Sequence, residues 1–392
     1  MTEMVFPPWP SYTEEEADAV SRVLLSNRVN YWTGGEGRAF EKEFAAFCGC
    51  DHAVALANGT LALELALKAL GIGPGDEVIV PSYTFIATAS AVAIRGAVPV
   101  VADVDRESLT ITAETIAEKM TSRTAGVIPV HLMGHPCDMD PIMSLASEHG
   151  LKVVEDCAQA HGARYKGRSV GTIGDAGAWS FCQDKIMTTG GEGGMVTTND
   201  RTLWSKIWAD KDHGKSWDAV YGREHKPGFR WLHESFGTNA RMTELQAVLG
   251  RIQLCRMPEW SRRRRENARH LTEGFLTIPG LRVAGISADV EHAWYKYYVF
   301  VERERLGEGW DRDRVMNAVT GRGVPCFSGV CPEIYLEKAF GDAGLAPEAR
   351  LPVARQCGET SLQFLVHPTL EERHMRFTCD TLREVMAQAV VA

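Results

Sequence analysis

Short apolar runs alternate with amphipathic stretches of helical length between residues 50 and 200. The apolar runs are rich in β-branched residues and predict strands at 53–57, 77–80, 98–104, 126–131, 152–156, 176–181 and 194–198. The stretches between them predict helices at 61–70, 86–95, 113–120 and 140–149. This alternation predicts an α/β fold, a mostly parallel sheet with helices on both faces. Ligands of such sheets bind beyond the carboxyl ends of the strands.

The pattern changes after residue 203. The polar stretch at 210–238 carries glycines and aromatic residues and is too long for a plain connector, so we expect it to be functional or mobile. A long helix is predicted from about Met242 past Arg269, interrupted at Pro258 because proline has no amide hydrogen. A strand at 294–302 and helices at 312–320 and 371–389 follow. We therefore predict a large domain (1–250) and a smaller C-terminal α+β domain (251–392).

Composition and charge narrow the class of protein. Hydrophobic residues make up 45% of the 392 residues and charged residues 24%, which is typical of a globular protein. The net charge of −9 lacks the positive footprint that nucleic acid requires, so no nucleic-acid partner is expected. Ten cysteines are scattered without a CxxC pair, which favours reduced thiols and a cytoplasmic protein. No signal-like or membrane-spanning segment is recognised, so no membrane partner is expected.

Candidate chemistry is concentrated in motifs that follow predicted strands. Successive side chains on a strand face opposite ways, so only one of Glu155 and Asp156 points to the ligand side, and Asp156 is nearer the loop. A carboxylate at this place suits a protonated pyridine nitrogen, because the ion pair keeps the ring cationic and able to accept electrons. Taken alone, Asp156 is more commonly a turn residue at the end of a strand.

The motif that follows the next predicted strand contains Lys185. A single lysine in a glycine-rich loop is usually solvated, but two neighbours favour a binding role. Ser180 lies five residues earlier and can donate to a phosphate. The glycines between Gly190 and Gly194 let the backbone pass close to a bound ring, where a Cβ would collide.

The sequence Asn58-Gly59-Thr60 lies between a predicted strand and a predicted helix. Its amides form the N-terminus of that helix, which is a natural cradle for phosphate, although a simple helix cap explains the residues equally well. A phosphate cradle, an acid for a pyridine nitrogen and a loop lysine together describe a pyridoxal phosphate site.

These residues give the chain a family resemblance over nearly its whole length. It resembles the fold type I, pyridoxal phosphate-dependent nucleotide-sugar aminotransferases of the DegT family. The matching blocks are Asn58-Gly59-Thr60, PSYTF at 81–85, HLMGHPCDMD at 131–140, EDCAQAHG at 155–162, Ser180 to Lys185, the glycine loop at 190–194 and NARMTELQ at 239–246, with weaker matches at Trp294-Tyr295 and 365–368.

The resemblance implies an aspartate-aminotransferase-like fold of type I and roles for individual residues of the site. Lys185 would hold the cofactor covalently, Asp156 would pair with the pyridine nitrogen and Gln159 would bind near the phenolic oxygen. Phe85 would stack on the ring, although it could equally be a core aromatic. The residues that would meet the phosphate are Asn58, Gly59, Thr60 and Ser180, together with Asn239 from a second subunit. The expected enzyme is therefore a homodimer with shared active sites.

The resemblance also implies the reaction. An amino acid, glutamate, would give its amino group to a ketosugar carried on a nucleoside diphosphate, with Lys185 as the base that moves the protons. Two departures from the family pattern are Asn58, where serine is usual, and Ala240, where an aromatic is common. Some relatives carry histidine in place of the lysine and catalyse a dehydration, a reaction that Lys185 disfavours here.

Other interpretations stay open at this stage. The protein could be a sensor that keeps the cofactor without turnover, or an aminotransferase for a cyclitol or aminobenzoate-precursor ketone. A metal-dependent hydrolase could be built on His131, His135 and Cys137, with Asp138 and Asp140 nearby, although turn chemistry explains most of this run and no metal is expected. The basic run Arg262 to Arg265 is interpreted as a solvated helix face, with a diphosphate contact as the alternative.

Overall fold

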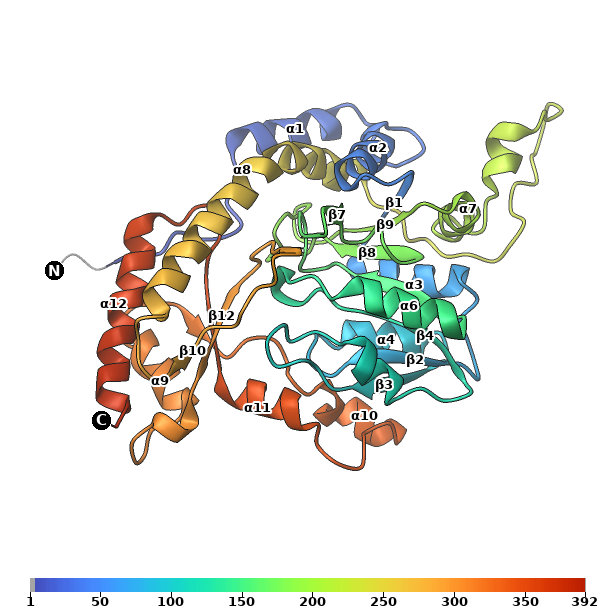
Figure 1. Ribbon diagram of the computed structural model, residues 1–392. Helices are drawn as coiled ribbons and strands as arrows, with labels where there is room; N and C mark the ends of the chain where they lie inside the picture. Colours follow the sequence, from blue (N-terminus) through green and yellow to red (C-terminus); the bar gives the residue numbers. More distant parts are fainter. Residues whose placement is uncertain (1–3, 392) are drawn as a thin grey trace.

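The computed structural model describes residues 4–391 and contains a large mixed sheet with the order β1-β9-β8-β5-β4-β2-β3 (Figure 1). Its strands are β1 (His52–Leu56), β2 (Glu77–Pro81), β3 (Val98–Ala102), β4 (Thr124–Val127), β5 (Lys152–Asp156), β8 (Ala176–Ser180) and β9 (Gly194–Thr198). Pairing is parallel from β3 to β8, while β9 runs antiparallel to both β8 and β1. The predicted α/β fold with a mostly parallel sheet is confirmed.

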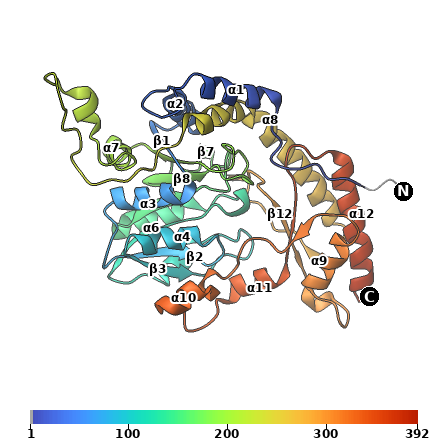
Figure 2. The same ribbon diagram turned by 180° about the vertical axis from the view of Figure 1, so that it is seen from behind.

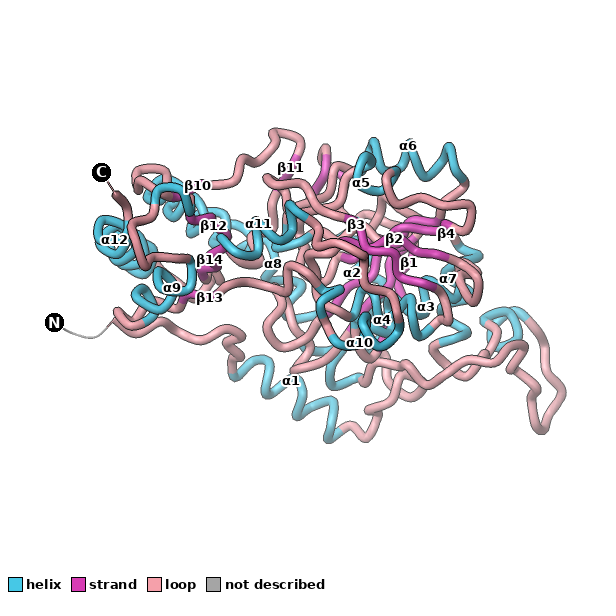
Figure 3. The backbone as a smooth tube through the Cα atoms, turned by 90° about the horizontal axis from the view of Figure 1, so that it is seen from below, coloured by secondary structure: helices cyan, strands magenta, loops and turns pink. Residues whose placement is uncertain are grey.

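Helices cover both faces of this sheet, as Figure 3 shows for α5 and α6 on one face and α3 and α4 on the other. The helices of this part are α1 (Glu14–Leu25), α2 (Glu36–Cys48), α3 (Gly59–Ala69), α4 (Ala87–Ile94), α5 (Ala113–Ala117), α6 (Met139–His149) and α7 (Arg201–Asp210). Short elements complete it: η1 (Leu132–Gly134), η2 (Asp218–Gly222), β6 (Arg164–Tyr165) and β7 (Arg168–Ser169), the latter two forming a small sheet with β11 (Val290–Glu291). Strands buried on both faces explain the continuous apolar runs in the sequence.

One predicted strand is wrong in its second half. The run 126–131 pairs as a strand only up to Val127, and residues 132–134 form the 3-10 turn η1. Pro129 cannot donate to the ladder, although its carbonyl accepts from the amide of Asp156. Pairing with β5 continues beyond β4 only as a single bridge, between Val130 and Asp156, and the amide of His131 donates to the carbonyl of Asp156 at 3.1 Å. This contact carries His131 to the end of β5.

A second, antiparallel sheet lies in the C-terminal part, with the order β10-β12-β14-β13 and its own apolar core. The strands are β10 (Leu281–Arg282), β12 (Tyr297–Val301), β13 (Cys326–Phe327) and β14 (Ser361–Phe364). The helices are α9 (Arg312–Thr320), α10 (Lys338–Ala343), α11 (Pro352–Thr360) and α12 (Glu372–Ala389), with 3-10 turns η3 (Arg303–Arg305) and η4 (Ile334–Leu336). This sheet has the predicted α+β character. The boundary near residue 250 remains a proposal, because a single helix runs across it.

That helix, α8 (Glu244–Phe275), is unbroken, so the predicted interruption at Pro258 is wrong. Figures 1 and 2 show α8 running from α1 and α2 at one end to α12 at the other. An interior proline costs a helix about 3 kcal/mol. Packing on both sides of Pro258 outweighs that cost, with Met257 and Arg264 fully buried on the same helix.

The residues at the start of the described chain lie against the C-terminal part. His374 in α12 bonds the carbonyl of Val5 at 3.2 Å, and Thr369 donates to the carbonyl of Pro8 at 3.2 Å. Phe6 packs on the rings of His374 and Phe377. The N-terminal residues therefore help to fix the small sheet beside the large one.

The middle of the stretch between α7 and α8, residues 218–238, projects from the body as an arm, seen in yellow-green beyond α7 in Figure 1. Both ends of the stretch are buried, with Lys211 and Met242 at 0% and 1% exposed. The arm exposes four aromatic side chains: Tyr221, Phe229, Trp231 and Phe236. Exposed apolar side chains grouped on one segment indicate an interaction surface. Within the described residues, no helix is long and apolar enough to cross a bilayer.

The contact between α2 and α8 requires a small residue at position 250. A Cβ built on Gly250 would lie 2.5 Å from the ring of Phe40, which is fully buried. We predict that Gly250→Ala lowers the free energy of unfolding by about 1–3 kcal/mol, because the ring must move in a packed core. Urea denaturation followed by circular dichroism measures this. Gly341→Ala is the control, since open space surrounds that helical glycine, and equal stability of the two variants would contradict the prediction.

Candidate active site

Asp156 ends β5 at the carboxyl edge of the large sheet and is 5% exposed. Thr88 in α4 donates its hydroxyl to Oδ2 at 2.9 Å, and the amide of Ala158 donates to Oδ1 at 3.1 Å. Burial raises the pKa of Asp156, and the two donors and the charge of Lys185 counter it only in part. Within the described chain no cation approaches this carboxylate as an ion pair, so it is built to receive a cationic partner. Sequence analysis missed Thr88, which lies one helical turn from Thr84 and bonds it at 3.0 Å.

Lys185 lies in the turn after β8 with 16% of its side chain exposed. The indole of Trp9 donates to the carbonyl of Lys185 at 2.8 Å, and the Lys185 amide donates to Cys182 at 3.1 Å. The next two residues, Ile186 and Met187, are fully buried and anchor the turn in the core. The backbone is therefore fixed while the amine remains accessible. The contribution of Trp9, 176 residues away, carries no signal in the sequence.

Asn58, Gly59 and Thr60 form the start of α3 beside the same edge. The Asn58 side chain accepts from the amide of Leu61 at 2.9 Å, so it is a true helix cap. The amides of Gly59 and Thr60 belong to the first turn, where an α-helix provides no acceptor of its own. These two amides and the positive end of the helix dipole are thus available to an anion. The Asn58 side chain therefore caps the helix, while the amides of Gly59 and Thr60 remain free to bind a phosphate.

Ser180 ends β8 directly opposite this helix start. A Cβ on Gly59 would lie 2.7 Å from the Cβ of Ser180, and one on Gly194 would collide with the carbonyl of Asn58. Ser180 accepts the amide of Cys182 at 3.3 Å and keeps its own hydroxyl hydrogen to donate. The strand end, the helix start and the glycine loop therefore meet around one small space, as the sequence predicted.

Gln159 and Phe85 complete the edge in different ways. Gln159 is buried, and its Oε1 accepts the amide of Met133 at 2.8 Å, which turns its amino group toward any acceptor in the site. Phe85 is 61% exposed, so it is no core aromatic. An exposed phenyl ring that follows the buried Thr84 is available for stacking on a flat ligand.

Asn239 lies in a segment that pairs with the chain just before Asn58. The carbonyl of Ala240 accepts the amide of Ala57, and Asn239 itself pairs with Asp212 through the backbone. Asn239 is exposed at the base of the arm, and within residues 4–391 its side chain makes no hydrogen bond to the other predicted site residues.

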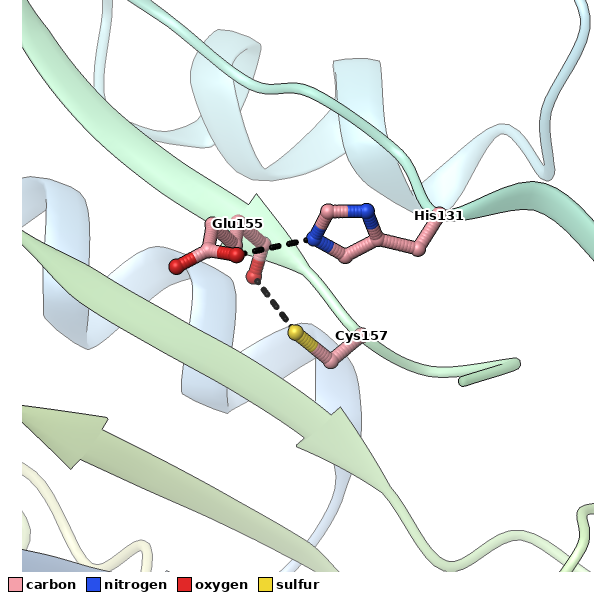
Figure 4. A group of neighbouring side chains, drawn as sticks. All are labelled: His131, Glu155 and Cys157. Carbon is pink, nitrogen blue, oxygen red and sulfur yellow. Dashed lines mark hydrogen bonds and ion pairs between the residues drawn. The ribbon is translucent and has the colours of Figure 1, made fainter. Parts of the chain in front are cut away.

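Of the residues that the sequence offered as metal ligands, His131 lies in a group of side chains that could hold a metal ion. Its companions there are Glu155 and Cys157, which were not among those candidates, as Figure 4 shows. Glu155, however, accepts His131 at 2.9 Å and the amides of Gly171, Ile173 and Gly174 at 2.7–2.8 Å. Burial raises the pKa of Glu155, but these donors outweigh it and hold the pKa below its usual value. Its oxygens are saturated by hydrogen bonds, which leaves little for a metal ion.

The other members of that run have separate partners. Asp138 accepts from Tyr165 at 2.5 Å, and Asp140 is paired with Lys166 and Arg168 on the surface. The ring of His135 lies against His292. The arrangement therefore gives no support to a metal-dependent hydrolase.

A cluster of polar residues to which the sequence gave no role lies beside Lys185. The Nζ of Lys185 is 3.9 Å from Asp184 and 5.2 Å from the centre of the Tyr295 ring. The Tyr295 hydroxyl donates to Asp184. Lys296 lies against the same ring. Asp184 falls within the family match from Ser180 to Lys185 and Tyr295 within a weaker match, whereas Lys296 carried no sequence signal.

The expectation for the basic run Arg262 to Arg265 is wrong at one position. Arg262 is exposed and paired with Glu259 and Glu266, but Arg264 is 1% exposed. Its Nη1 donates to the carbonyls of Trp294 and Tyr295 at 3.1 and 3.2 Å. A helix turns 100° per residue, so one of the four consecutive arginines points inward. The four identical residues in the sequence do not show which one this is.

The residues fit pyridoxal phosphate. The buried Asp156 carboxylate lacks a cationic partner, the amides of Gly59 and Thr60 face Ser180, and the accessible Lys185 amine lies in the same edge. Gly59 and Gly194 leave room that a Cβ would fill. Phe85 would cover the ring, and the free amino group of Gln159 would donate to the phenolic oxygen. These are the donors and charges that the cofactor's phosphate, pyridine nitrogen and aldehyde require.

Known proteins support this assignment. The sequence profile of the DegT/DnrJ/EryC1/StrS aminotransferase family matches residues 10–383. The chain is 38% identical over 378 residues to dTDP-3-amino-3,4,6-trideoxy-alpha-D-glucose transaminase of Streptomyces venezuelae, covering 95% of this chain and 93% of that one. It is 39% identical over 362 residues to GDP-perosamine synthase of Caulobacter vibrioides, covering 91% and 92%.

A solved structure extends the comparison to the fold. The aminotransferase from Psychrobacter cryohalolentis superposes with a TM-score of 0.97 at 60% identity, covering 98% of this chain and 99% of that one. The chain therefore belongs to the DegT/DnrJ/EryC1/StrS aminotransferase family and is a pyridoxal phosphate-dependent transaminase.

Proposed function

We propose that this protein moves an amino group from glutamate to the keto carbon of a nucleotide-linked deoxysugar. The observation that carries the proposal is the accessible Lys185 amine in the same edge as the buried Asp156 and the phosphate cradle at the start of α3. Transaminases for nucleotide-linked sugars among the relatives support the substrate class. The product would serve amino-sugar and polysaccharide biosynthesis.

Each residue has a distinct task in this reaction. Bound pyridoxal phosphate supplies an electron-accepting ring and a carbonyl carbon that joins to amines. The Lys185 amine takes the proton from Cα of the amino donor and later gives a proton to the carbon that receives the new amine. Asp156 holds the ring nitrogen in its protonated form, and Thr88 fixes the carboxylate. The amides of Gly59 and Thr60, with Ser180, hold the phosphate and set the orientation.

We further propose a cytoplasmic homodimer in which Asn239 reaches the phosphate of the second subunit. The exposed aromatic side chains of the arm support the dimer, because a second copy can bury them. The free state of all ten cysteines supports a reducing compartment.

The first prediction tests whether Lys185 is the catalytic amine. We predict that the wild-type protein is yellow, bleaches on addition of glutamate and then aminates at least one ketosugar nucleotide from a panel. Lys185→Ala should bind the cofactor only non-covalently and lose at least about 10³-fold in kcat, because base and covalent anchor are both removed. Mass spectrometry after borohydride reduction locates the label. Lys338→Ala, at an exposed site, is the control.

The same experiment distinguishes the proposed function from its alternatives. A coloured protein that glutamate does not bleach would indicate a sensor. Turnover only with cyclitol-type ketones would indicate that the acceptor substrate is such a ketone and not a nucleotide-linked sugar. Lys185→Ala with wild-type turnover would refute the assignment of the catalytic amine.

Asp156 gives a second prediction. Asp156→Asn keeps the shape and the Thr88 contact but removes the charge that holds the ring nitrogen protonated. We expect the glutamate half-reaction to slow by about 10²–10³-fold with cofactor affinity changed far less. Stopped-flow absorbance measures the half-reaction. Cofactor loss as large as the rate loss would contradict an electrostatic role and indicate a binding role instead.

The arm gives a third prediction. Trp231 and Phe236 are 82% and 97% exposed, and we expect Trp231→Ser with Phe236→Ser to weaken the dimer by at least about tenfold, because hot-spot aromatics dominate such interfaces. Sedimentation equilibrium measures the dissociation constant. Leu276→Ser, at an exposed site at the end of α8, is the control. If the double variant dimerises like the wild type, the arm is not part of the dimer interface.

A further inference from the structure

Two cations beside Lys185 lack a carboxylate partner. Lys296 precedes β12, and its Nζ lies 5.1 Å from the centre of the Tyr295 ring, while that of Lys185 lies 5.2 Å from it. Arg264 reaches the same segment from α8 and bonds the carbonyls of Trp294 and Tyr295. Within residues 4–391, neither Lys296 nor Arg264 has an ion pair, and Nε and Nη2 of Arg264 have no hydrogen-bond acceptor.

The carboxylate that faces this cluster is already engaged. Asp184 accepts the hydroxyl of Tyr295, and Lys185 is 3.9 Å away. Lys296 is attracted by the charge of Asp184 but makes no direct hydrogen bond to it. One carboxylate therefore stands against Lys185, Lys296 and Arg264, and when Lys185 is joined to the cofactor it still faces the two cations Lys296 and Arg264.

The cluster stays positive at neutral pH. Burial lowers the pKa of Lys296 to about 8, with Asp184 opposing the shift and Arg264 and Lys185 adding to it. Burial lowers the pKa of Arg264 to about 9. The nearby His161 and His367 have their pKa lowered to about 3, chiefly by burial, so both are neutral. Burying a cation without a counter-ion raises the free energy of the folded protein, and a bound anionic ligand would offset that increase.

We propose that Lys296 is the binding residue of an anion subsite beside Lys185, and that its ligand is the carboxylate of the amino donor. This inference rests on the proposed transamination. Arg264 lies too deep to touch the ligand. It is a positioning residue that holds the backbone of Trp294 and Tyr295 and adds positive charge from behind.

The position of the subsite favours the donor over the nucleotide sugar. The α-carboxylate of an amino acid is attached to the carbon that loses its proton to Lys185, so it must lie beside that amine. Lys185 and Lys296 both lie over the ring of Tyr295, 5.2 and 5.1 Å from its centre, and the charge of Lys185 acts on Lys296, so the subsite lies near that amine. The diphosphate of a nucleotide sugar is attached at the far side of the sugar ring from the keto carbon, and would need a site farther from Lys185.

The test uses holoenzyme and probes that cannot react. Glutarate carries the two carboxylates of glutamate without the amine, and uridine diphosphate carries the diphosphate without the sugar. We expect Lys296→Met to weaken glutarate binding by at least about tenfold in isothermal titration calorimetry, because a buried charge pair is lost, and to leave uridine diphosphate binding within twofold. Lys296→Arg should restore most of the glutarate affinity. Lys338→Met is the control.

Kinetics give an independent arm. Lys296→Met should raise the glutamate concentration needed for half-maximal bleaching, while the reverse reaction with the amino-sugar product keeps its KM. Unchanged glutarate binding in Lys296→Met would overturn the inference, as would loss of uridine diphosphate binding instead. If the wild type does not bleach with glutamate, the proposed function fails first, and glutarate titration still reports whether the subsite exists.

Discussion

The site depends on one constraint. The carboxylate of Asp156, at the end of β5, is buried, and within residues 4–391 it has no cationic ion-pair partner. Thr88 and the amide of Ala158 orient Asp156, and burial raises its pKa. Such a group gains stability from a protonated ring nitrogen that brings charge into the site. The parallel sheet makes this possible, because its central strands end in a region covered by helices and loops. The cradle, the lysine turn and the stacking ring are arranged around that point.

The two adjacent acids of β5 show how strand geometry divides roles. Glu155 points to the opposite face, where His131 and three backbone amides saturate it and hold its pKa below the usual value. It ties the end of β5 to the turn before β8 and so stabilises the strand that carries Asp156. Two adjacent carboxylates thus differ in role: Glu155 is a structural anchor, and Asp156 is the cofactor ligand that we propose. The difference depends on whether the surrounding donors leave an acceptor position of the carboxylate free.

The sequence predicted the elements well where the signal was local. Strand and helix positions in the large sheet, the cap at Asn58 and the glycine contacts at Gly59 and Gly194 follow from residue type and spacing. The errors have a common cause in tertiary packing. The helix through Pro258 persists because both of its halves are packed. The strand predicted to His131 ends at Val127, and beyond it only one bridge, from Val130 to Asp156, continues the pairing before the 3-10 turn η1 begins. Arg264 is buried although its three neighbours are basic too.

The sequence by itself determined the fold class and, through its family motifs, the cofactor, because these depend on periodicity and on motifs that lie within a few residues of a strand end. It also supplied the residues that we propose for the site, Lys185 among them. Only the tertiary structure decided which distant groups complete the site. Thr88 on Asp156, Trp9 on the Lys185 carbonyl and Arg264 behind Tyr295 come from separate elements. Their contacts depend on how helices and sheets pack, and no local pattern of residues encodes that packing.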